Sequence, residues 1–340
     1  MEDNLERLHQ LVQNKRKVLI ATHTNPDPDS IASAYALRHL FASWRINSVL
    51  VYGGIIGRAE NKAMITRLRI PMRSIQTVNP FNFTVVSLVD CQPFSGNAPL
   101  PVSLVPSIVV DHHPARKISL FKKIPFVDIR PAYGSASSIL TEYLLKEGVD
   151  INRKLATALY YGIMSDTRYL GRDAHEEDVK LSAALYPKVL VKTLSQIEYP
   201  PLPREYFRIL GQALERTVWY PSQGVLLSEL GEMEDPDMVA IIADFLIRMD
   251  GVRWLIVLGE MDHEVFFSLR TTGYHKGSAD KLARDLIRGM EGASAGGHES
   301  TAGGRWELVS VQNQEEAAKK LKERFLKRFD CDISKGIPVV

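Results

Sequence analysis

The chain has 340 residues, of which 45% are hydrophobic and 24% are charged, so it is long enough for two globular domains. Its formal net charge of +2 gives no overall field that would indicate nucleic acid or a membrane as partner. The two cysteines, Cys91 and Cys331, lack the spacing of a metal site and suggest a reducing compartment. Because the amino terminus is acidic and no apolar run approaches the roughly 20 residues that span a bilayer, we expect cytoplasmic residence.

The first half of the chain alternates short apolar runs with stretches of helical periodicity. The apolar runs predict strands at Val18–Ala21, Ser48–Val51, Val85–Val89 and Ser107–Val110. The helical patterns lie near 30–42, 58–68, 135–147, 152–165 and 175–190. This alternation predicts an α/β domain over residues 1–190, in which helices flank a mostly parallel sheet.

The second half has a different order of elements. The proline-rich segment Tyr199–Pro203 cannot continue a helix, so residues 191–216 are predicted to hold a linker and a connecting helix near 204–216. Residues 217–340 predict a smaller α/β domain on a mixed sheet. Its predicted elements are a strand at 224–230, a helix at 236–249, a hairpin of strands 252–259 and 263–270, a helix at 278–290, a strand at 306–311 after a glycine-rich segment, and a helix at 314–328.

Polar residues follow several of the predicted strands. Asp111-His112-His113 comes directly after Ser107–Val110, at the end of the strand that would face the ligand crevice of an open α/β sheet. Three further segments place histidine or aspartate at the ends of predicted elements: His23–Ser30, Asp90 and Asp166. Together they predict a metal site.

Each of these residues also has a plainer interpretation. Asp29 or Ser30 can cap the helix that follows, and Asp90 can cap a turn. His23 alone is more often a hydrogen-bonded histidine, and Asp166 can simply end a helix. Taken singly, the structural interpretation is the better one for these residues, but the same coincidence in four segments favours the metal site.

The residue types favour Mn²⁺, with Mg²⁺ as a substitute, because carboxylates suit hard cations and imidazole adds borderline nitrogen ligands. No thiolate is present to suggest structural Zn²⁺. A carboxylate that bridges two ions holds them about 3.5–4 Å apart, the spacing of two-metal phosphoryl-transfer sites. Asp27 and Asp29 lie on a loop restricted by Pro26 and Pro28 and can face different ions.

These segments resemble the motifs of the DHH phosphoesterase superfamily, which includes RecJ-type exonucleases, short-oligoribonuclease/pAp phosphatases, cyclic-dinucleotide phosphodiesterases and exopolyphosphatases. The matching segments, in motif order, are His23–Ser30, Asp90, Asp111-His112-His113 and Asp166. Gly296-Gly297-His298 resembles the Gly-Gly-Gly-His signature of the associated DHHA1 domain. The resemblance covers residues 17 to 312 and implies a DHH catalytic domain followed by a DHHA1 substrate-binding domain.

The resemblance also implies two Mn²⁺ ions, with Asp90 bridging them. The residues that match ligands of one ion are His23, Asp27 and Asp90. Those that match ligands of the other are Asp29, Asp90, His112 and Asp166. His113 matches a catalytic residue near the scissile phosphate, and Asp111 matches a partner that orients a histidine.

Substrate contacts are implied for the second domain. Gly296 and Gly297 allow a ligand to approach the backbone, and free N–H groups there would form an anion nest, with a flexible loop as the plainer alternative. His298 within the run favours use in binding. Arg270 is similar to the arginine of the family's Ser-Leu-Arg-Ser segment, and a structural salt bridge is the competing interpretation.

Two positions depart from the family pattern. Ala295 stands where the first glycine of the signature is usual, which would alter the backbone approach to a substrate. Arg168 stands where glycine is common after the fourth motif. Its guanidinium could contact a substrate phosphate or form a surface salt bridge.

The resemblance implies a hydrolase in which metal-bridging hydroxide attacks a phosphodiester or phosphomonoester. The expected substrates are short oligonucleotides or small nucleotides such as pAp, held across a cleft by the second domain, where Tyr274 is a candidate for base stacking. An exopolyphosphatase or inorganic pyrophosphatase is the alternative within the class. A non-catalytic nucleotide-binding regulatory protein is the alternative outside it, and the full set of metal-type residues argues against it. The sequence indicates no membrane and no obligate protein partner, and it is compatible with a homodimer.

Overall fold

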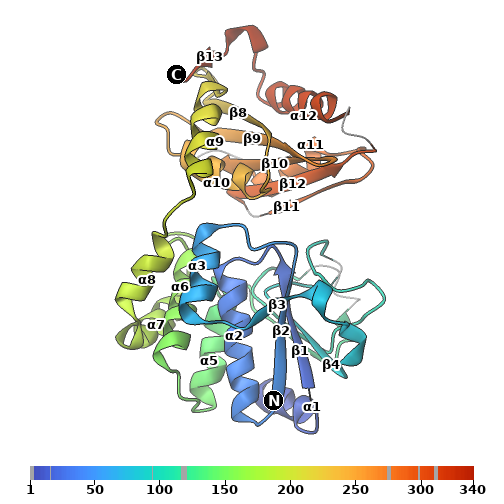
Figure 1. Ribbon diagram of the computed structural model, residues 1–340, viewed down its shortest axis with the longest axis vertical. Helices are drawn as coiled ribbons and strands as arrows, with labels where there is room; N and C mark the ends of the chain where they lie inside the picture. The colour runs from blue at the N-terminus through green and yellow to red at the C-terminus, as the bar shows by residue number, and fades with distance from the viewer. Residues whose placement is uncertain are drawn as a thin grey trace. The chain divides into compact units, whose positions relative to one another are not determined.

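The structure is a computed structural model that describes residues 4–15, 17–93, 95–115, 121–273, 277–297, 299–309 and 313–340. The chain divides into two compact units, Met1–Pro201 and Leu202–Val340 (Figure 1). Each unit has its own sheet, so each is described by itself.

The first unit contains a six-stranded parallel sheet in the order β3-β2-β1-β4-β5-β6. Its strands are β1 (Lys17–Thr24), β2 (Asn47–Gly53), β3 (Met72–Ser74), β4 (Val85–Val89), β5 (Ile108–Asp111) and β6 (Phe126–Ile129). The strand order changes direction between β1 and β4. Their carboxyl ends therefore flank the switch point at which open α/β sheets bind ligands.

Helices cover this sheet and supply most of its core. They are α1 (Asn4–Val12), α2 (Pro28–Ser43), α3 (Ala59–Leu68), α5 (Ala136–Lys146), α6 (Arg153–Asp166), α7 (Glu176–Leu185) and α8 (Val191–Glu198), with 3₁₀ turns at Ile75–Thr77, Pro80–Asn82 and Tyr186–Lys188. The central helix α2 packs against α5 and α6 as well as β1 and β2, which explains why it is apolar around most of its circumference. A smaller apolar cluster lies elsewhere in the unit and includes side chains of β1, β4 and β5.

The structure confirms the predicted parallel sheet and adds elements that the sequence patterns did not predict, namely α1, β3, β6 and α8. The strand β3 has three residues, too few for a periodic signal, and the apolar run of β6 is interrupted by the charged Asp128. The helix predicted to reach 190 ends at Leu185, where Pro187 accompanies a 3₁₀ turn. The first unit extends past 190 because Leu194 and Ile197 of α8 are buried in its core.

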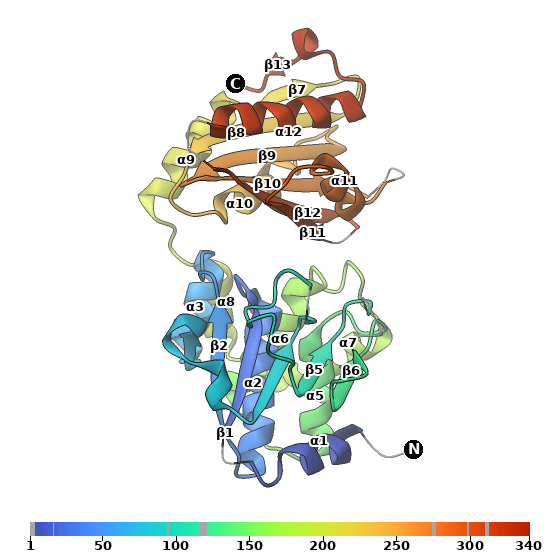
Figure 2. The same ribbon diagram turned by 90° about the vertical axis from the view of Figure 1, so that its right-hand side faces the viewer.

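The second unit contains a seven-stranded mixed sheet in the order β11-β12-β10-β9-β8-β7-β13 (Figure 2). Its strands are β7 (Val218–Tyr220), β8 (Val225–Glu232), β9 (Trp254–Met261), β10 (Glu264–Thr271), β11 (Ala293–Gly297), β12 (Thr301–Glu307) and β13 (Ile337–Pro338). Its helices are α9 (Arg204–Glu215), α10 (Met238–Leu246), α11 (Ala279–Leu286) and α12 (Gln314–Arg328), with a 3₁₀ turn at Ile333–Lys335. Among the described residues of this unit, β8 and β9 are the one pair of strands that run parallel, and the predicted hairpin of β9 and β10 is confirmed.

In the glycine-rich segment of the second unit, residues 293–297 and 301–307 form strands, whereas a loop or an anion nest was expected there. Gly296 pairs with Gly303 in an antiparallel hairpin of β11 and β12, and β12 continues the sheet from β10. The strand expected at 306–311 therefore begins five residues earlier, at Thr301. Glycine weakens a strand signal in the sequence, and here the neighbouring strand β10 supplies the pairing.

No helix among the described residues has both the length and the apolar character that a membrane crossing needs.

Candidate metal centre

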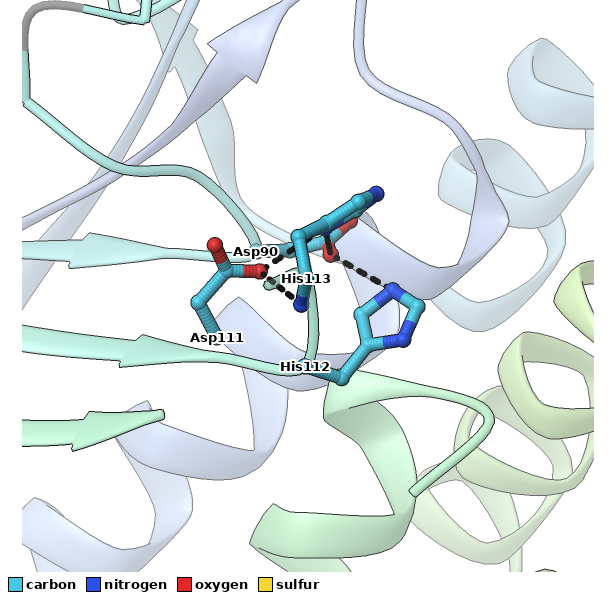
Figure 3. Close-up of side chains that lie close together, drawn as sticks. All are labelled: Asp90, Asp111, His112 and His113. Atoms are coloured by element: carbon cyan, nitrogen blue, oxygen red, sulfur yellow. Dashed lines mark hydrogen bonds and ion pairs between the residues drawn. The ribbon is translucent and has the colours of Figure 1, made fainter. Parts of the chain in front are cut away.

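Four segments of the first unit, at residues 23–29, 90, 111–113 and 166, bring histidine and aspartate side chains to the carboxyl edge of its sheet. His23 is the last residue but one of β1, Asp90 follows β4, and Asp111 is the last residue of β5. His112 and His113 continue from β5, and Figure 3 shows their rings beside the Asp90 carboxylate. Because parallel strands end at one edge of the sheet, segments far apart in sequence meet there.

The loop after β1 is fixed by the start of helix α2. Asp27 caps this helix, since its Oδ1 accepts a hydrogen bond from the backbone N–H of Ser30 at 2.9 Å. The cap is therefore Asp27, rather than Asp29 or Ser30 as the plainer interpretation of the sequence had it. His23 is oriented by its Nδ1, which lies 2.9 Å from the carbonyl oxygen of Thr24, and its Nε2 lies 3.6 Å from Asp27.

Asp29 is buried, with 1% of its surface exposed. Its two oxygens accept hydrogen bonds from the backbone N–H groups of Ala136 (2.7 Å) and Ser137 (2.8 Å), which form the first turn of α5. The free N–H groups of a helix N-terminus favour an anion, so α5 opposes the effects of burial and neighbouring carboxylates, which raise the pKa of Asp29.

Asp90 lies at the centre of the cluster, with 3% of its surface exposed. Its backbone adopts a left-handed conformation with φ of 59°, and its N–H donates to the carbonyl of Val110. One carboxylate oxygen, Oδ2, lies 3.7 Å from Nε2 of His23, and the other, Oδ1, lies 3.5 Å from Nε2 of His112. A single carboxylate thus faces two separate groups of side chains.

The two histidines after β5 have different partners. Nε2 of His112 lies 3.1 Å from Oδ2 of Asp166, and its Nδ1 lies 3.3 Å from the carbonyl oxygen of Tyr133. Nδ1 of His113 instead lies 2.9 Å from Oδ1 of Asp111. The contacts place His112 among the carboxylates and attach His113 to the buried Asp111.

The ligand atoms form groups that a cation could occupy. Three sets have ligand atoms within 4.8 Å of one another: His23 with Asp27 and Asp90; Asp29 with His112 and Asp166; and Asp90 with Asp111, His112 and His113. Oδ1 of Asp90 is buried and has no hydrogen-bond partner among the described residues. A buried carboxylate oxygen without a donor is costly, and a bound cation would satisfy it. The oxygen and imidazole donors present fit Mn²⁺ or Mg²⁺.

The electrostatics of the cluster indicate more negative charge than the protein itself neutralises. Burial, together with the charge of Asp27, raises the pKa of Asp90 to about 6. Burial and the charges of Asp90 and Asp166 raise the pKa of Asp29 well above its ordinary range. Burial disfavours the charged form of His23, but Asp27 and Asp90 outweigh burial and raise its pKa to about 10. Cations bound here would replace protons as the counter-charge.

The substrate-binding residues expected in the second unit have different surroundings. The Arg270 guanidinium is buried, and it donates to Oδ1 of Asp244 at 2.7 Å and to Oγ of Ser268 at 2.7 Å, as the salt-bridge alternative requires. Gly296 is open: a Cβ added there would meet no atom within 4 Å. At Gly297 a Cβ would lie 2.4 Å from the Cα of Ala302, so the hairpin itself requires that glycine. His298 lies outside the described residues, as does Tyr274.

The structure also shows the surroundings of the two positions that depart from the family pattern, Arg168 and Ala295. Arg168 is exposed and follows Asp166 in a left-handed conformation, with φ of 46°. That conformation explains why glycine suits the position. Ala295 lies in β11 and packs against the core of the second unit, so its side chain points away from the Gly296 face.

Sequence reasoning did not identify Gln92, the Tyr133 carbonyl or the first turn of α5 as parts of the site. Gln92 lies two residues after Asp90 and donates to Oδ2 of Asp111 at 2.7 Å. A single glutamine belongs to no recognisable motif. The Tyr133 carbonyl and the first turn of α5 contact residues that lie far away in the sequence. Only the proximity of Gln92 to Asp90 could have drawn attention to it.

Two family models match the chain, the DHH family N-terminal domain over residues 17–163 and the DHHA1 domain over residues 222–327. An uncharacterized protein of Methanocaldococcus jannaschii is 35% identical over 320 residues, which make up 93% of this chain and 63% of that protein. The cyclic-di-AMP phosphodiesterase GdpP of Bacillus subtilis is 23% identical over 96% of this chain and 50% of its own length. A probable manganese-dependent inorganic pyrophosphatase of Streptococcus agalactiae is 26% identical over 50% of this chain and 54% of its own length. The chain therefore spans between half and two thirds of these relatives.

Solved structures share the fold. An exopolyphosphatase-related protein from Bacteroides fragilis superimposes with a TM-score of 0.74 at 17% identity, over 96% of both chains. RecJ in complex with Mn²⁺ from Thermus thermophilus superimposes with a TM-score of 0.53 at 14% identity, over 96% of this chain and 54% of that chain. At these identities the likeness establishes the fold alone.

Proposed function

This chain belongs to the DHH family and carries a DHHA1 domain, and from that premise we propose that it is a two-metal phosphoesterase acting on short oligonucleotides or on small nucleotides such as pAp. The observation that carries the proposal is the position of Asp90. Its Oδ2 faces His23 at 3.7 Å and its Oδ1 faces His112 at 3.5 Å, as a carboxylate between two ions would. The manganese named for the pyrophosphatase relatives and for the RecJ structure supports Mn²⁺.

The proposed ligands divide into two sets that share Asp90. One ion would be held by His23, Asp27 and Asp90, and the other by Asp29, Asp90, His112 and Asp166. Such a pair of cations, when bound, would neutralise a phosphate group and make water nucleophilic at neutral pH. Backbone N–H groups would hold two of these carboxylates in place, Asp27 through Ser30 and Asp29 through the first turn of α5.

His113 is the residue that we propose to act on the phosphate. Its side chain is 33% exposed, whereas that of its partner Asp111 is 1% exposed, so the imidazole has one buried and one accessible edge. Burial disfavours its charged form, but the hydrogen bond to Asp111 outweighs burial and raises the pKa of His113. A charged imidazolium with Nδ1 bound to Asp111 would present its Nε2 proton to a phosphate oxygen.

The second unit would bind the part of the substrate that does not react. Ala295 and Ala302 face the core beside α11, so Gly296 and Gly303 face the opposite side of the sheet. Gly303 pairs with Gly296, and these two partly exposed glycines make a row of small residues across β12 and β11. Ser268, which pairs with Gly303 on β10, is 2% exposed and accepts a hydrogen bond from Arg270, so the row does not extend to β10. The accessible backbone of the two glycines allows close approach by a flat group such as a base or a sugar.

The main alternative is hydrolysis of polyphosphate or pyrophosphate, which the pyrophosphatase and exopolyphosphatase-related similarities favour. A ligand made only of phosphates needs a concentration of cationic side chains. In the described part of the hairpin β11–β12, the cation is Arg305, which already pairs with Glu264 at 3.0 Å. The row of small residues therefore fits a nucleoside better than a phosphate chain.

The test is a panel of substrates with Mn²⁺: pAp, a ribodinucleotide, the linear dinucleotide product of a cyclic dinucleotide, polyphosphate and pyrophosphate. We expect the first three to be hydrolysed, with activity lost in excess chelator and restored best by Mn²⁺. Asp90→Ala protein, purified in the same way, is the control for contaminating phosphatases. Preferential hydrolysis of polyphosphate or pyrophosphate would establish the alternative, and full activity in chelator would exclude the two-metal hypothesis.

A further inference from the structure

The side chain of Gln92 connects the turn that follows Asp90 with the turn that contains Asp111, His112 and His113. It lies two residues beyond Asp90 and is buried, with 3% of its surface exposed. Its Nε2 lies 2.7 Å from Oδ2 of Asp111, 3.1 Å from the carbonyl oxygen of His113 and 3.3 Å from that of Pro114. One amide group thus donates into a carboxylate and into the backbone of the turn that follows it.

These contacts fix Asp111 from both sides. Its Oδ2 accepts from Gln92, while its Oδ1 accepts from Nδ1 of His113 at 2.9 Å and from the backbone N–H of His113 at 3.2 Å. With 1% of its surface exposed, the carboxylate has little water to replace a lost donor. Removing the amide would leave Oδ2 unsatisfied in the interior and allow the carboxylate to rotate away from His113.

The position of the link in the fold explains why a side chain is needed there. Strands β4 and β5 pair as far as Val89 and Val110, and the N–H of Asp90 then donates to Val110. Beyond that bond, the described residues show no backbone hydrogen bond between the turn at 90–93 and the turn at 111–115. Gln92 continues the connection where the sheet has ended.

The chemistry of the amide suits this place. It is a neutral donor, so it satisfies Asp111 without adding a positive charge beside the cluster that includes Asp90. A lysine or arginine there would compete with cations for the same carboxylates.

We propose that Gln92 is a positioning residue that acts through Asp111 to hold the His113 imidazole in its working orientation. The proposal rests on the proposed function for its effect on turnover, although the geometry of the link is independent of it. The competing explanation is that Gln92 merely fills space, in which case an apolar side chain of the same length would serve equally well.

The experiment compares Gln92→Met, which keeps the length and removes the donor, with Gln92→Glu, which keeps the shape and turns an acceptor toward Asp111. Cys91→Ala is the matched control, because Cys91 is the buried neighbour and belongs to an apolar cluster. We measure kcat and KM on the best substrate of the wild-type protein, bound Mn²⁺, and hydrogen–deuterium exchange of peptides covering residues 108–115.

We expect Gln92→Met to lower kcat about 10- to 100-fold, the usual effect of losing an outer hydrogen-bond partner of a metal site. KM and bound Mn²⁺ should be nearly unchanged, and Gln92→Glu should lose at least as much. Exchange at 111–115 should increase in both variants and not in Cys91→Ala. In an Asp111→Asn background, Gln92→Met should change kcat less than about twofold, because the two residues act as a unit.

Normal kcat in a folded Gln92→Met protein would overturn the proposal, and so would full additivity with Asp111→Asn. Loss of Mn²⁺ in step with kcat would also overturn it, because the amide would then support the metal ligands rather than His113. If Gln92→Met does not fold, Gln92→Glu decides by the same criteria. If the wild-type protein hydrolyses none of the substrates, the proposed function fails, and the exchange measurement still tests the link.

Discussion

The two units carry their candidate functional residues in opposite ways. In the first unit, buried and partly buried histidine and aspartate side chains from four segments converge on one edge of a parallel sheet. Backbone groups of distant segments hold some of them: N–H groups of α5 donate to Asp29, and the carbonyl oxygen of Tyr133 lies beside His112. In the second unit, the candidate binding surface is formed by residues without side chains, since Gly296 lies opposite Gly303 in a single hairpin. Holding cations requires fixed carboxylates and imidazoles, whereas binding the flat part of a substrate requires exposed backbone.

The difference appears in how each unit tolerates substitution. In the first unit, the functional side chains contact one another and three of them, Asp29, Asp90 and Asp111, are buried, so removing one leaves partners unsatisfied. In the second unit, an added methyl group at Gly296 would enter open space and leave the fold unchanged. Substitutions in the first unit should therefore affect metal content and kcat, and those on the row of small residues should affect KM.

The largest effect is expected from Asp90→Ala. This change removes the carboxylate that faces both His23 and His112, so both cations should be lost and kcat should fall by about 10³-fold or more. The measurement is metal analysis of the purified protein together with steady-state kinetics. An Asp90→Ala protein that retains two Mn²⁺ and turns over normally would contradict the bridging assignment.

A smaller loss, with a separation of roles, is expected from the adjacent histidines. His112→Ala should lose metal and activity together, because Nε2 of His112 lies 3.1 Å from Asp166. His113→Ala should retain its metal and lose about 10²- to 10⁴-fold in kcat, the range for removal of a general acid. His39→Ala, which removes a partly buried histidine of α2, is the control and should do neither. Equal metal loss in both variants would mean that His113 is a ligand too.

Much of the first unit could be predicted because its signals are local. Strand ends and the spacing of His23, Asp27 and Asp29 are visible in the sequence. The sequence suggested Asp29 or Ser30, and not Asp27, as the cap of α2. Asp29 instead accepts hydrogen bonds from the first turn of α5, more than 100 residues away, which the sequence does not reveal. The contact between Gln92 and Asp111 was hidden for the same reason: it depends on how two turns meet after β4 and β5 end.

The second unit was harder to predict because glycine gives a weak strand signal. The hairpin β11–β12 depends on the pairing of β12 with β10, whose partners lie from 31 positions apart (Arg270 and Thr301) to 43 positions apart (Glu264 and Glu307). The motif Gly296-Gly297 was visible, but its two glycines have different reasons to be there. Gly297 is required by the hairpin, and Gly296 is not, which only the surrounding atoms reveal.

An intermediate effect, on substrate binding alone, is expected from Gly296→Ala. The added methyl group meets no atom of the protein, so the free energy of unfolding should change by less than about 0.5 kcal/mol. The methyl group should hinder close approach of the substrate and raise KM about tenfold, equivalent to about 1.4 kcal/mol.

The matched control is Gly304→Ala on the same hairpin. A Cβ there would lie 2.5 Å from the ring of Phe267, which is 1% exposed, so the protein should be destabilised by about 1–3 kcal/mol. KM measured on the folded fraction should stay normal. If Gly296→Ala leaves KM unchanged, the row of small residues does not contact the substrate.

The smallest effect is expected from substitutions of Arg168. They distinguish backbone strain at this position from contact between its side chain and a substrate. Arg168 occupies a left-handed conformation with φ of 46°, which costs a non-glycine residue about 1–2 kcal/mol. Arg168→Gly should relieve part of that strain and raise Tm by about 2–4 °C, whereas Arg168→Ala keeps the conformation and should not. Both variants lack the guanidinium, so a shared rise in KM would support contact between Arg168 and a substrate phosphate. Unchanged KM in both would assign the side chain to a surface contact, and an equal Tm in the two variants would show that the left-handed turn stores no strain at this position.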